Sequence, residues 1–269
     1  MPVKKFSALK FESGTPNDVE DFLTIEDILQ ITVNGIPYTT TMRTPGSDYF
    51  LTKGLLWTEG IISCKDVPLV YSERQDPTKG INVSVDFSIP DKFICKNPEG
   101  NRSIASSSSC GMCGKVDASD IEIKGQPLKP HSSLNVNIIG QMQREMCNRQ
   151  ADFKKSGGSH AAAAFTINGG LLAMAEDIGR HNAVDKVIGE LLEEGSLDQA
   201  ECLTISGRLS YEIVAKAYAA SIPHVIAVSA PSSLAVEAAE KLGMTVIGFC
   251  RAKQATVYSN IANVSTRID

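Results

Sequence analysis

The sequence lacks long apolar runs and has no excess of basic residues. Nowhere do about eighteen apolar residues stand in a row, the length that a helix needs to cross a bilayer. Residues 1–22 lack the apolar core of a signal peptide. The net charge of -5 and the pI near 5.5 give no general attraction to nucleic acid or to anionic membranes. We therefore expect a cytoplasmic protein that binds neither, and that holds any anionic ligand in a local basic pocket.

Cysteine patterns typical of disulfide frameworks and zinc sites are also missing. The seven cysteines form an odd set without regular spacing, which argues against a secreted disulfide scaffold. Cys110 and Cys113 stand at Cys-x-x-Cys spacing, but the second ligand pair of a structural zinc site is absent. Deaminase zinc chemistry needs a His-x-Glu before its cysteine pair, whereas His160 follows the pair and precedes two alanines. We expect no bound metal; a metal-binding deaminase or hydrolase is the alternative.

The first half of the chain predicts a β-rich unit with one clear helix, residues 1–130. Hydrophobic residues make up 42% and charged residues 21%, which is ordinary for a folded globular protein. Residues 1–24 are polar and predict a weakly structured leader with at most one edge strand. Asn34-Gly35 between β-rich runs predicts a hairpin. Apolar spacing then predicts a helix ending near Gly60, followed by strands at residues 67–72, 81–89 and 92–96.

The second half, residues 131–269, predicts an α/β unit. Residues 134–153 have helical periodicity, and Asn168-Gly169-Gly170 predicts a hairpin between two strands. Helices between short apolar strands imply crossover connections and a largely parallel sheet covered on both faces. The expected helices and strands are residues 180–194, 202–206, 210–220, 224–229, 232–242, 245–250 and 255–259.

The cysteine pair lies in a loop-like segment, residues 104–117, with the sequence IASSSSCGMCGKVD. Small polar residues before the pair favour a mobile loop. Glycines after both cysteines permit close approach of a ligand or partner, and Lys115 could favour the thiolate form. Thiol chemistry on a loop that visits a donor and an acceptor is one interpretation, and two small loop residues without chemistry is the other.

Three strand-to-helix junctions predict a ligand site at one edge of the sheet. Ligands of α/β sheets bind at the carboxyl ends of the strands, where helix N-termini favour phosphate. The segment 173–192 crowds charged side chains beside Gly179, and the segments 205–212 and 229–237 place Ser, Gly or Pro at helix starts. Helix capping and solvated charge are the alternative. The charged residues of interest here are Glu176, Asp177, Arg180, His181, Asp185 and Arg208, whereas His131 and His224 are interpreted as structural.

Taken together, these segments resemble the FdhD/NarQ family of formate dehydrogenase accessory sulfurtransferases. The matching stretches are RTPGSDYFLTKGLLWTEGII, SSCGMCGK, GGSHAAAAF, AEDIGRHNAVDKVIG, SGRLSYE and GFCR, in that order over residues 43–251. The resemblance implies that a cysteine desulfurase loads a persulfide on the loop. The sulfur then reaches the bis-guanine-dinucleotide form of the molybdenum cofactor before its insertion into formate dehydrogenase. It also implies a homodimer, and a cytidine-deaminase-like three-layer α/β/α domain after a smaller β-rich domain.

Residue by residue, the resemblance implies Cys110 as the persulfide carrier and Cys113 as an assisting or relaying thiol. The cofactor-binding segment falls on Phe249, Cys250, Arg251, Ala252, Lys253 and Gln254. The strand-to-helix junctions described above add Arg180, Arg208 and His181 as candidate cofactor-binding residues. The carboxylate of Asp177 or Asp185 could recognise the guanine base. A guanine nucleotide is expected to bind as a mimic of the cofactor. The alternative function is a molybdenum-cofactor-binding chaperone without sulfur transfer.

Overall fold

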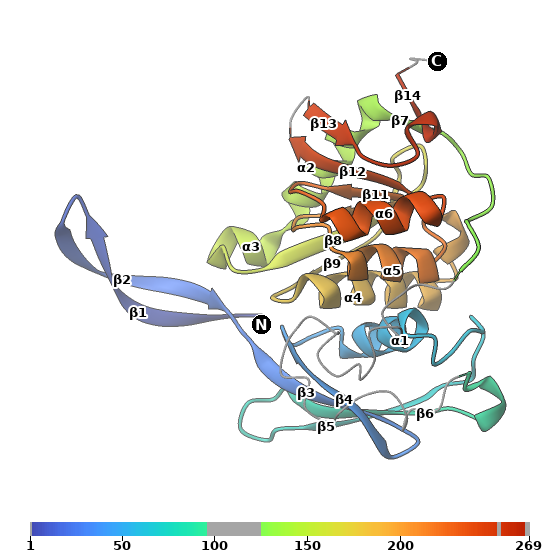
Figure 1. The fold of residues 1–269 in the computed structure, drawn as a ribbon. Helices are drawn as coiled ribbons and strands as arrows, with labels where there is room; N and C mark the ends of the chain where they lie inside the picture. Colours follow the sequence, from blue (N-terminus) through green and yellow to red (C-terminus); the bar gives the residue numbers. More distant parts are fainter. Residues whose placement is uncertain (1, 96–124, 252–253, 267–269) are drawn as a thin grey trace.

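The computed structural model describes residues 2–95, 125–251 and 254–266. The chain forms an extended two-stranded arm, a four-stranded sheet and a six-stranded sheet with helices between and around them (Figure 1). The α/β class predicted from the sequence is confirmed. None of the helices within the described ranges is long and apolar enough to cross a membrane.

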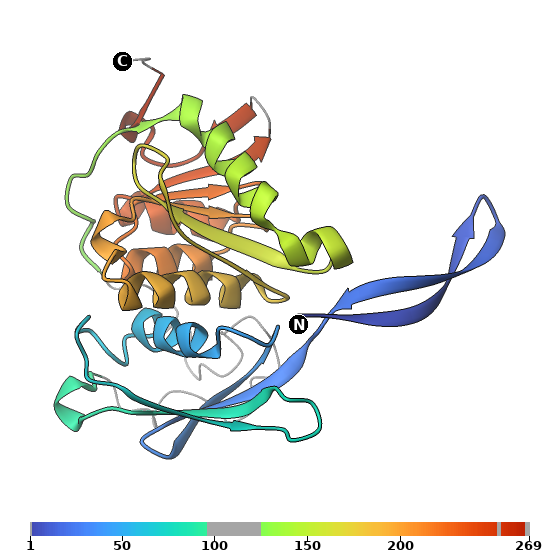
Figure 2. The same ribbon diagram turned by 180° about the vertical axis from the view of Figure 1, so that it is seen from behind.

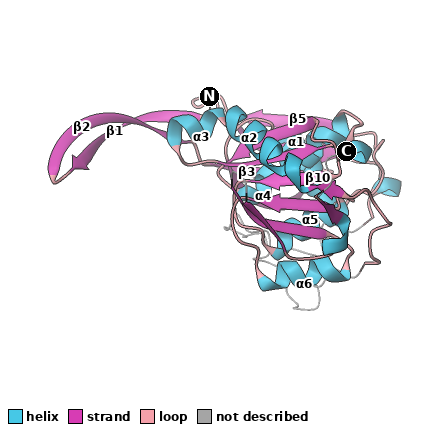
Figure 3. Ribbon diagram, turned by 90° about the horizontal axis from the view of Figure 1, so that it is seen from above, coloured by secondary structure: helices cyan, strands magenta, loops and turns pink. Residues whose placement is uncertain are grey.

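The arm consists of β1 (Val3–Glu12) and β2 (Thr15–Thr24), paired antiparallel along their whole length. Ser13 and Gly14 have φ angles of 51° and 86°, the two positive values that a tight two-residue hairpin turn needs. The prediction of a weakly structured leader was therefore wrong, because the Ser-Gly dipeptide is a turn signal between two strand-forming runs. Figures 2 and 3 show the arm projecting away from the rest of the chain.

The small sheet has the strand order β4-β3-β6-β5 and is covered by helix α1 (Asp48–Thr58). The predicted Asn34-Gly35 hairpin is confirmed between β3 and β4. Leu51 and Leu56 of α1 pack with Ile31 and Phe87 of the sheet in a buried apolar cluster. Residues 92–96 were expected as a strand, but residues 91–93 form a 3₁₀ turn and Ile94 only a single bridge to Ile62. The strands are β3 (Asp27–Val33), β4 (Ile36–Arg43), β5 (Val70–Gln75) and β6 (Asn82–Ser88).

The large sheet has the order β13-β12-β11-β10-β8-β9. β10, β11 and β12 are parallel, and β9 runs in their direction because it is antiparallel to β8, which is antiparallel to β10. The predicted hairpin joins β8 to β9. The strands are β8 (His160–Phe165), β9 (Leu171–Asp177), β10 (Cys202–Ile205), β11 (His224–Ala227), β12 (Thr245–Arg251) and β13 (Gln254–Val257), and β7 (Leu134–Asn135) pairs separately with β14 (Val264–Ser265).

Helices cover both faces of the large sheet, as expected. α4 (Arg180–Glu193), α5 (Tyr211–Ala219) and α6 (Ser233–Lys241) pack on one face, and α2 (Ile139–Arg149) packs on the other (Figure 1). Neighbouring strand residues supply the two cores, since Val225 faces α4–α6 while Ile226 faces α2. The three-layer α/β/α arrangement follows; its likeness to cytidine deaminases stays a prediction. The expected helix at residues 134–153 is divided into α2 and α3 (Ala151–Ser156) around Gln150.

Helix α1 lies against α4 and joins the small sheet to the large one. The two helices meet at glycines, where a Cβ on Gly54 would stand 1.9 Å from the Asp185 carbonyl oxygen, and one on Gly189 would stand 1.9 Å from that of Phe50. Trp57 Nε1 of α1 also donates to Ala219 O of α5 at 2.9 Å. The backbones of α1 and α4 therefore touch without side chains between them.

Residues 125–130 were placed in the first unit by the sequence, yet their contacts are with the second. Leu128 N donates to Leu242 O at 2.9 Å, and Tyr218 OH donates to Gln126 O at 2.8 Å. The division of the chain into two domains at residue 130 stays a prediction.

Candidate functional site

The candidate site is the carboxyl edge of the large sheet. β9, β10 and β11 end there, and α4, α5 and α6 begin there, so the three predicted junctions lie on one edge. Leu209 N donates to Ala230 O at 3.1 Å, and Phe249 N donates to Ser229 O at 3.2 Å. These bonds connect the second junction to the third and the third to the end of β12. We call this edge the anion rim and define it by the residues 178–181, 206–212, 229–232 and 249–251.

Arg180 and Arg208 supply positive charge to the anion rim. A Cβ on Gly207 would lie 3.3 Å from His160 Nδ1 and 3.5 Å from Arg180 Cδ, so the arginine and the histidine flank this glycine. Arg180 Nε is buried and has no hydrogen-bond partner among the described residues, whereas Arg208 is exposed. Burial and then the charge of Arg180 lower the pKa of His160. A guanidinium with an unsatisfied buried N–H is suited to bind an anionic ligand by donating a hydrogen bond to it.

His181 is buried at the first turn of α4 and links this helix to α5. Its Nε2 lies 2.7 Å from Glu212 Oε2 and 3.3 Å from Ser210 Oγ. The side chain is only 6% exposed, so its described contacts are within the protein. In this arrangement His181 fixes the position of Glu212 at the rim.

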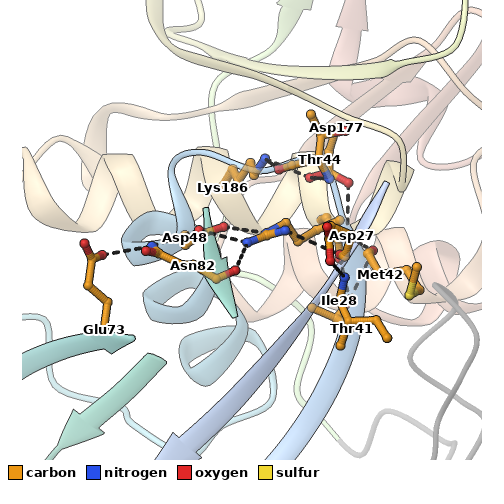
Figure 4. A network of polar contacts seen from close by, with 12 residues as sticks. Asp27, Ile28, Thr41, Met42, Thr44, Asp48, Glu73, Asn82, Asp177 and Lys186 are labelled. Carbon is orange, nitrogen blue, oxygen red and sulfur yellow. Dashed lines mark hydrogen bonds and ion pairs between the residues drawn. The ribbon is translucent and has the colours of Figure 1, made fainter. Parts of the chain in front are cut away.

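Asp177 ends β9 and is completely surrounded by donors of the protein. Its Oδ1 accepts from Gly179 N at 2.8 Å and Asn182 Nδ2 at 3.1 Å. Its Oδ2 accepts from Thr44 N at 3.1 Å and pairs with Lys186 Nζ at 2.7 Å. Figure 4 shows this carboxylate beside Thr44 and Lys186, at the contact between the small sheet and α4. The structure thus gives Asp177 a role in joining the two sheets.

A second ionic network continues on the small-sheet side of the same contact. The Arg43 guanidinium donates to both oxygens of Asp48, at 2.7 and 3.2 Å, and to the Asn82 carbonyl oxygen at 2.7 Å. Arg43 is fully buried and Asp48 nearly so, which leaves this arginine unable to reach a ligand at the rim. The end of β4 is therefore held by polar contacts to α1 and β6 on one side and to α4 and β9 on the other (Figure 4).

Asp185, the other carboxylate suggested for guanine, is engaged in the same way. It pairs with Lys216 at 2.7 Å and accepts from Thr58 Oγ1 at 2.9 Å. Burial raises the pKa of Asp185, and Lys216 is the main opposing influence. Both suggested carboxylates are thus used for internal contacts: Asp177 joins the end of β9 to Thr44 and α4, and Asp185 joins α4 to α1 and α5.

The C-terminal segment reaches the anion rim through a bulge in β12. The register shifts between Gly248 and Arg251, and Phe249 has a φ of 53°, a strained value for a side chain of this size. Phe249 as a whole residue is 47% exposed at the rim. Arg251 pairs with Gln254 across the β12–β13 hairpin, and both are exposed. Ala252 and Lys253 lie outside the described residues.

The cysteines of the described chain differ sharply in accessibility. Cys250 lies beneath the bulge, and burial raises its pKa to about 12. Cys64, Cys95 and Cys147 are exposed. Cys110 and Cys113, expected to carry the sulfur chemistry, lie outside the described residues. Within the described ranges, no group of three or more His, Cys, Asp or Glu side chains is arranged to hold a metal ion.

Two residues went unrecognised in the sequence: Glu212 of the anion rim, and His160, which lies beside Gly207 of the rim. His160 begins β8, directly opposite Asp177 in the β8–β9 ladder, so hairpin register was the signal that could have placed it at the edge. Glu212 stands in the first turn of α5, where an acidic residue is ordinarily interpreted as helix capping.

Comparison with known proteins agrees with this arrangement of segments. The model of the FdhD/NarQ family matches residues 24–265. The chain belongs to the FdhD/NarQ family. It is 38% identical over 264 residues to the sulfur carrier protein FdhD of Sulfolobus acidocaldarius, covering 97% of this chain and 98% of the relative. It is 40% identical over 246 residues to the sulfur carrier protein FdhD of Nocardia farcinica, covering 89% and 87%.

A solved structure shows the same fold. The crystal structure of a candidate formate dehydrogenase accessory protein from Desulfotalea psychrophila superposes with a TM-score of 0.76, over 98% of this chain and all of that one. The sequence identity is 20%, so this likeness concerns the fold alone. The resemblance of the motifs to the FdhD/NarQ family is confirmed by the family model, which matches most of the chain.

Proposed function

We propose that this protein is a sulfurtransferase of molybdenum cofactor maturation, with Cys110 as persulfide carrier. The Cys110 thiolate attacks the outer sulfur of a cysteine desulfurase persulfide, a new sulfur–sulfur bond forms, and the donor cysteine leaves as a thiolate. The outer sulfur would then pass to the bis-guanine-dinucleotide molybdenum cofactor, bound as substrate. The sulfur–sulfur bond would break, the two electrons that convert the outer sulfur to sulfide would come from the reduced metal of that substrate, and Cys110 would return to a thiolate. The names of the relatives support the sulfur carrier role.

The anion rim is the structural observation that carries the binding half of this proposal. A bis-guanine dinucleotide has two pyrophosphates, which need cations and N–H donors. The rim offers Arg180, with its unsatisfied Nε, the exposed side chains of Arg208 and Arg251, and three helix N-termini. Phe249 is exposed on a strained backbone, and its ring would stack on a base of the bound cofactor.

The first test is persulfide loading. The pure protein is incubated with a cysteine desulfurase and cysteine, and added sulfur is located by intact-mass and peptide spectrometry. We expect a gain of about 32 Da, one sulfur atom, that is lost in Cys110→Ala. Cys147→Ala, which removes an exposed cysteine of α2, is the matched control and should load normally. Absence of added sulfur in the wild type, with an active desulfurase, would favour the cofactor-binding chaperone instead.

The second test concerns nucleotide binding, with GDP as mimic of the cofactor. Arg251→Ala should lower the affinity for GDP, since a charged hydrogen bond to phosphate is worth about 1.5–3 kcal/mol. Arg144→Ala removes an exposed arginine from α2 and should bind GDP as the wild type does. Equal affinities of all three proteins would remove Arg251 from the site.

The same proposal includes two partners, a cysteine desulfurase as sulfur donor and formate dehydrogenase as recipient of the cofactor. It also includes a cytoplasmic location and a homodimeric state. The β1–β2 arm supports the homodimer. An isolated two-stranded hairpin is marginally stable in water, yet this one exposes large apolar side chains that a second copy would cover. They are Phe6, Leu9, Phe11, Phe22 and Leu23. Replacing Leu9 and Phe11 with serine should shift the molar mass measured by light scattering toward the monomer.

A further inference from the structure

One carboxylate of the anion rim has an oxygen that no described residue satisfies. Glu212 stands in the first turn of α5, and its Oε2 lies 2.7 Å from His181 Nε2. Its Oε1 is buried and without a hydrogen-bond partner, although the side chain as a whole is 16% exposed. A buried acceptor on a charged group is costly when unpaired, and few such groups persist in native proteins. Oε1 is therefore placed for a donor that the described chain does not provide.

The expected protein partner of Glu212 is occupied elsewhere. Lys216 follows four residues later on α5, the spacing at which a glutamate and a lysine normally pair on a helix. Instead, the Lys216 ammonium donates to both oxygens of the buried Asp185, at 2.8 and 2.7 Å. Asp185 thus holds the lysine on the α4 side and leaves Glu212 Oε1 without a partner among the described residues. Asp177, the other carboxylate at this edge, already accepts from donors on both oxygens.

We propose that Glu212 reads the guanine base of the bound nucleotide by accepting hydrogen bonds from its N1–H and N2–H groups. The inference rests on the proposed function, which brings a guanine nucleotide to this edge. An ionised carboxylate has about four lone-pair sites, and the described contact with His181 uses one. Guanine presents two adjacent N–H donors on its Watson–Crick edge, whereas adenine presents one donor beside an acceptor nitrogen that a carboxylate repels.

The surroundings of Glu212 fit a base next to a phosphate site. Arg208 precedes it by four residues and is exposed at the start of the same junction. The contacts of His181 with Glu212 and Ser210 hold the carboxylate in place, so His181 is a positioning residue. A β-bridge between Leu209 and Pro231 connects this junction to the neighbouring one. The neighbouring junction is in turn bonded to the β12 bulge, because Phe249 N donates to Ser229 O. Charge for phosphate, a carboxylate for the base and an exposed ring therefore share one edge.

The test is a change of base preference. Glu212→Gln keeps the size of the side chain but replaces one acceptor oxygen with an N–H donor. Xanthine carries a carbonyl oxygen where guanine carries its N2 amine, so the variant should prefer it. Affinities of the full-length protein for GDP, XDP and ADP are measured by titration calorimetry. We expect GDP binding to weaken about tenfold to a hundredfold and XDP binding to strengthen by a similar factor, with ADP unchanged.

Glu237→Gln, the same exchange at an exposed position of α6, is the matched control and should keep the wild-type preference. A gain of XDP binding cannot come from misfolding, which keeps the test independent of stability. Equal losses for GDP, XDP and ADP would indicate contact with the ribose or a structural role, and would overturn the inference alone. An unchanged GDP-to-XDP ratio would overturn it as well. A wild-type protein that binds no guanine nucleotide would overturn the proposed cofactor binding and this inference together.

Discussion

Asp177→Asn is predicted to destabilise the protein strongly while leaving its shape almost unchanged. The four described partners of the carboxylate are all donors: Thr44 N and Lys186 Nζ on one oxygen, Gly179 N and Asn182 Nδ2 on the other. An asparagine has one acceptor oxygen, so its amide N–H₂ must face one pair of donors in either orientation. The Lys186 side chain, only 3% exposed, also loses its counter-charge.

Removing one partner of a buried ion pair costs about 3–5 kcal/mol, a large part of the about 5–15 kcal/mol that stabilises a typical domain. We expect this loss in the free energy of unfolding of Asp177→Asn, measured by urea denaturation at pH 7. The double variant Asp177→Asn/Lys186→Met removes the stranded ammonium and should recover part of the loss.

Asp198→Asn is the matched control, because Asp198 pairs with Lys65 on the surface and is 85% exposed. Such exposed pairs contribute about 0–1 kcal/mol, so this variant should unfold much as the wild type does. A loss below about 1 kcal/mol in Asp177→Asn would refute the structural role given to the network. If that small change came with loss of GDP binding, Asp177 would return to the ligand site.

Three further outcomes are expected. Gly189→Ala should destabilise the protein by about 1–3 kcal/mol in urea denaturation, since its Cβ meets the Phe50 backbone, whereas at Gly170 the alanine meets only the Thr166 side chain and should be tolerated. His224 is buried with its pKa lowered to about 4, while the unfolded chain takes up the proton near pH 6.5, so stability should fall between pH 6.5 and 4 by on the order of 3 kcal/mol, and less in His224→Gln. In native protein at pH 8, iodoacetamide should modify the exposed Cys147 and spare the buried Cys250, as read by peptide mass spectrometry; rapid labelling of Cys250 would contradict its raised pKa.

Much of the fold was predictable because its signals are local. Asn34-Gly35 and Asn168-Gly169-Gly170 mark turns, and the alternation of apolar strands with helices after residue 180 reproduces α4 to β13 closely. The arm was missed because β1 and β2 bury almost nothing, and their apolar residues are interspersed with charged and polar ones that are typical of a solvent-exposed segment. The break at Gln150 was missed because helical periodicity continues across it.

The candidate site was predictable in its place but less so in its roles. Strand-to-helix junctions locate the anion rim from the sequence alone, because parallel strands end at a common edge. The role of a charged residue there depends on donors from distant segments. Asp177 is satisfied by Thr44, 133 positions earlier, and by Lys186. No local sequence pattern around Asp177 predicts that a donor from a distant segment contacts it.

The same reasoning explains why the open acceptor is Glu212 and not one of the carboxylates that the charge density of residues 173–192 suggested. Asp185 lies on the face of α4 that meets α1 and α5, so its burial requires a cation, and Lys216 is the cation that α5 can supply. Because one lysine serves the buried carboxylate, the partly exposed one is left with His181 alone among the described contacts. Lys216→Met should then destabilise the protein by stranding Asp185, whereas Glu212→Gln should alter nucleotide preference with little effect on unfolding. If both variants changed stability and neither changed the GDP-to-XDP ratio, Glu212 would belong to the same structural network as Asp185.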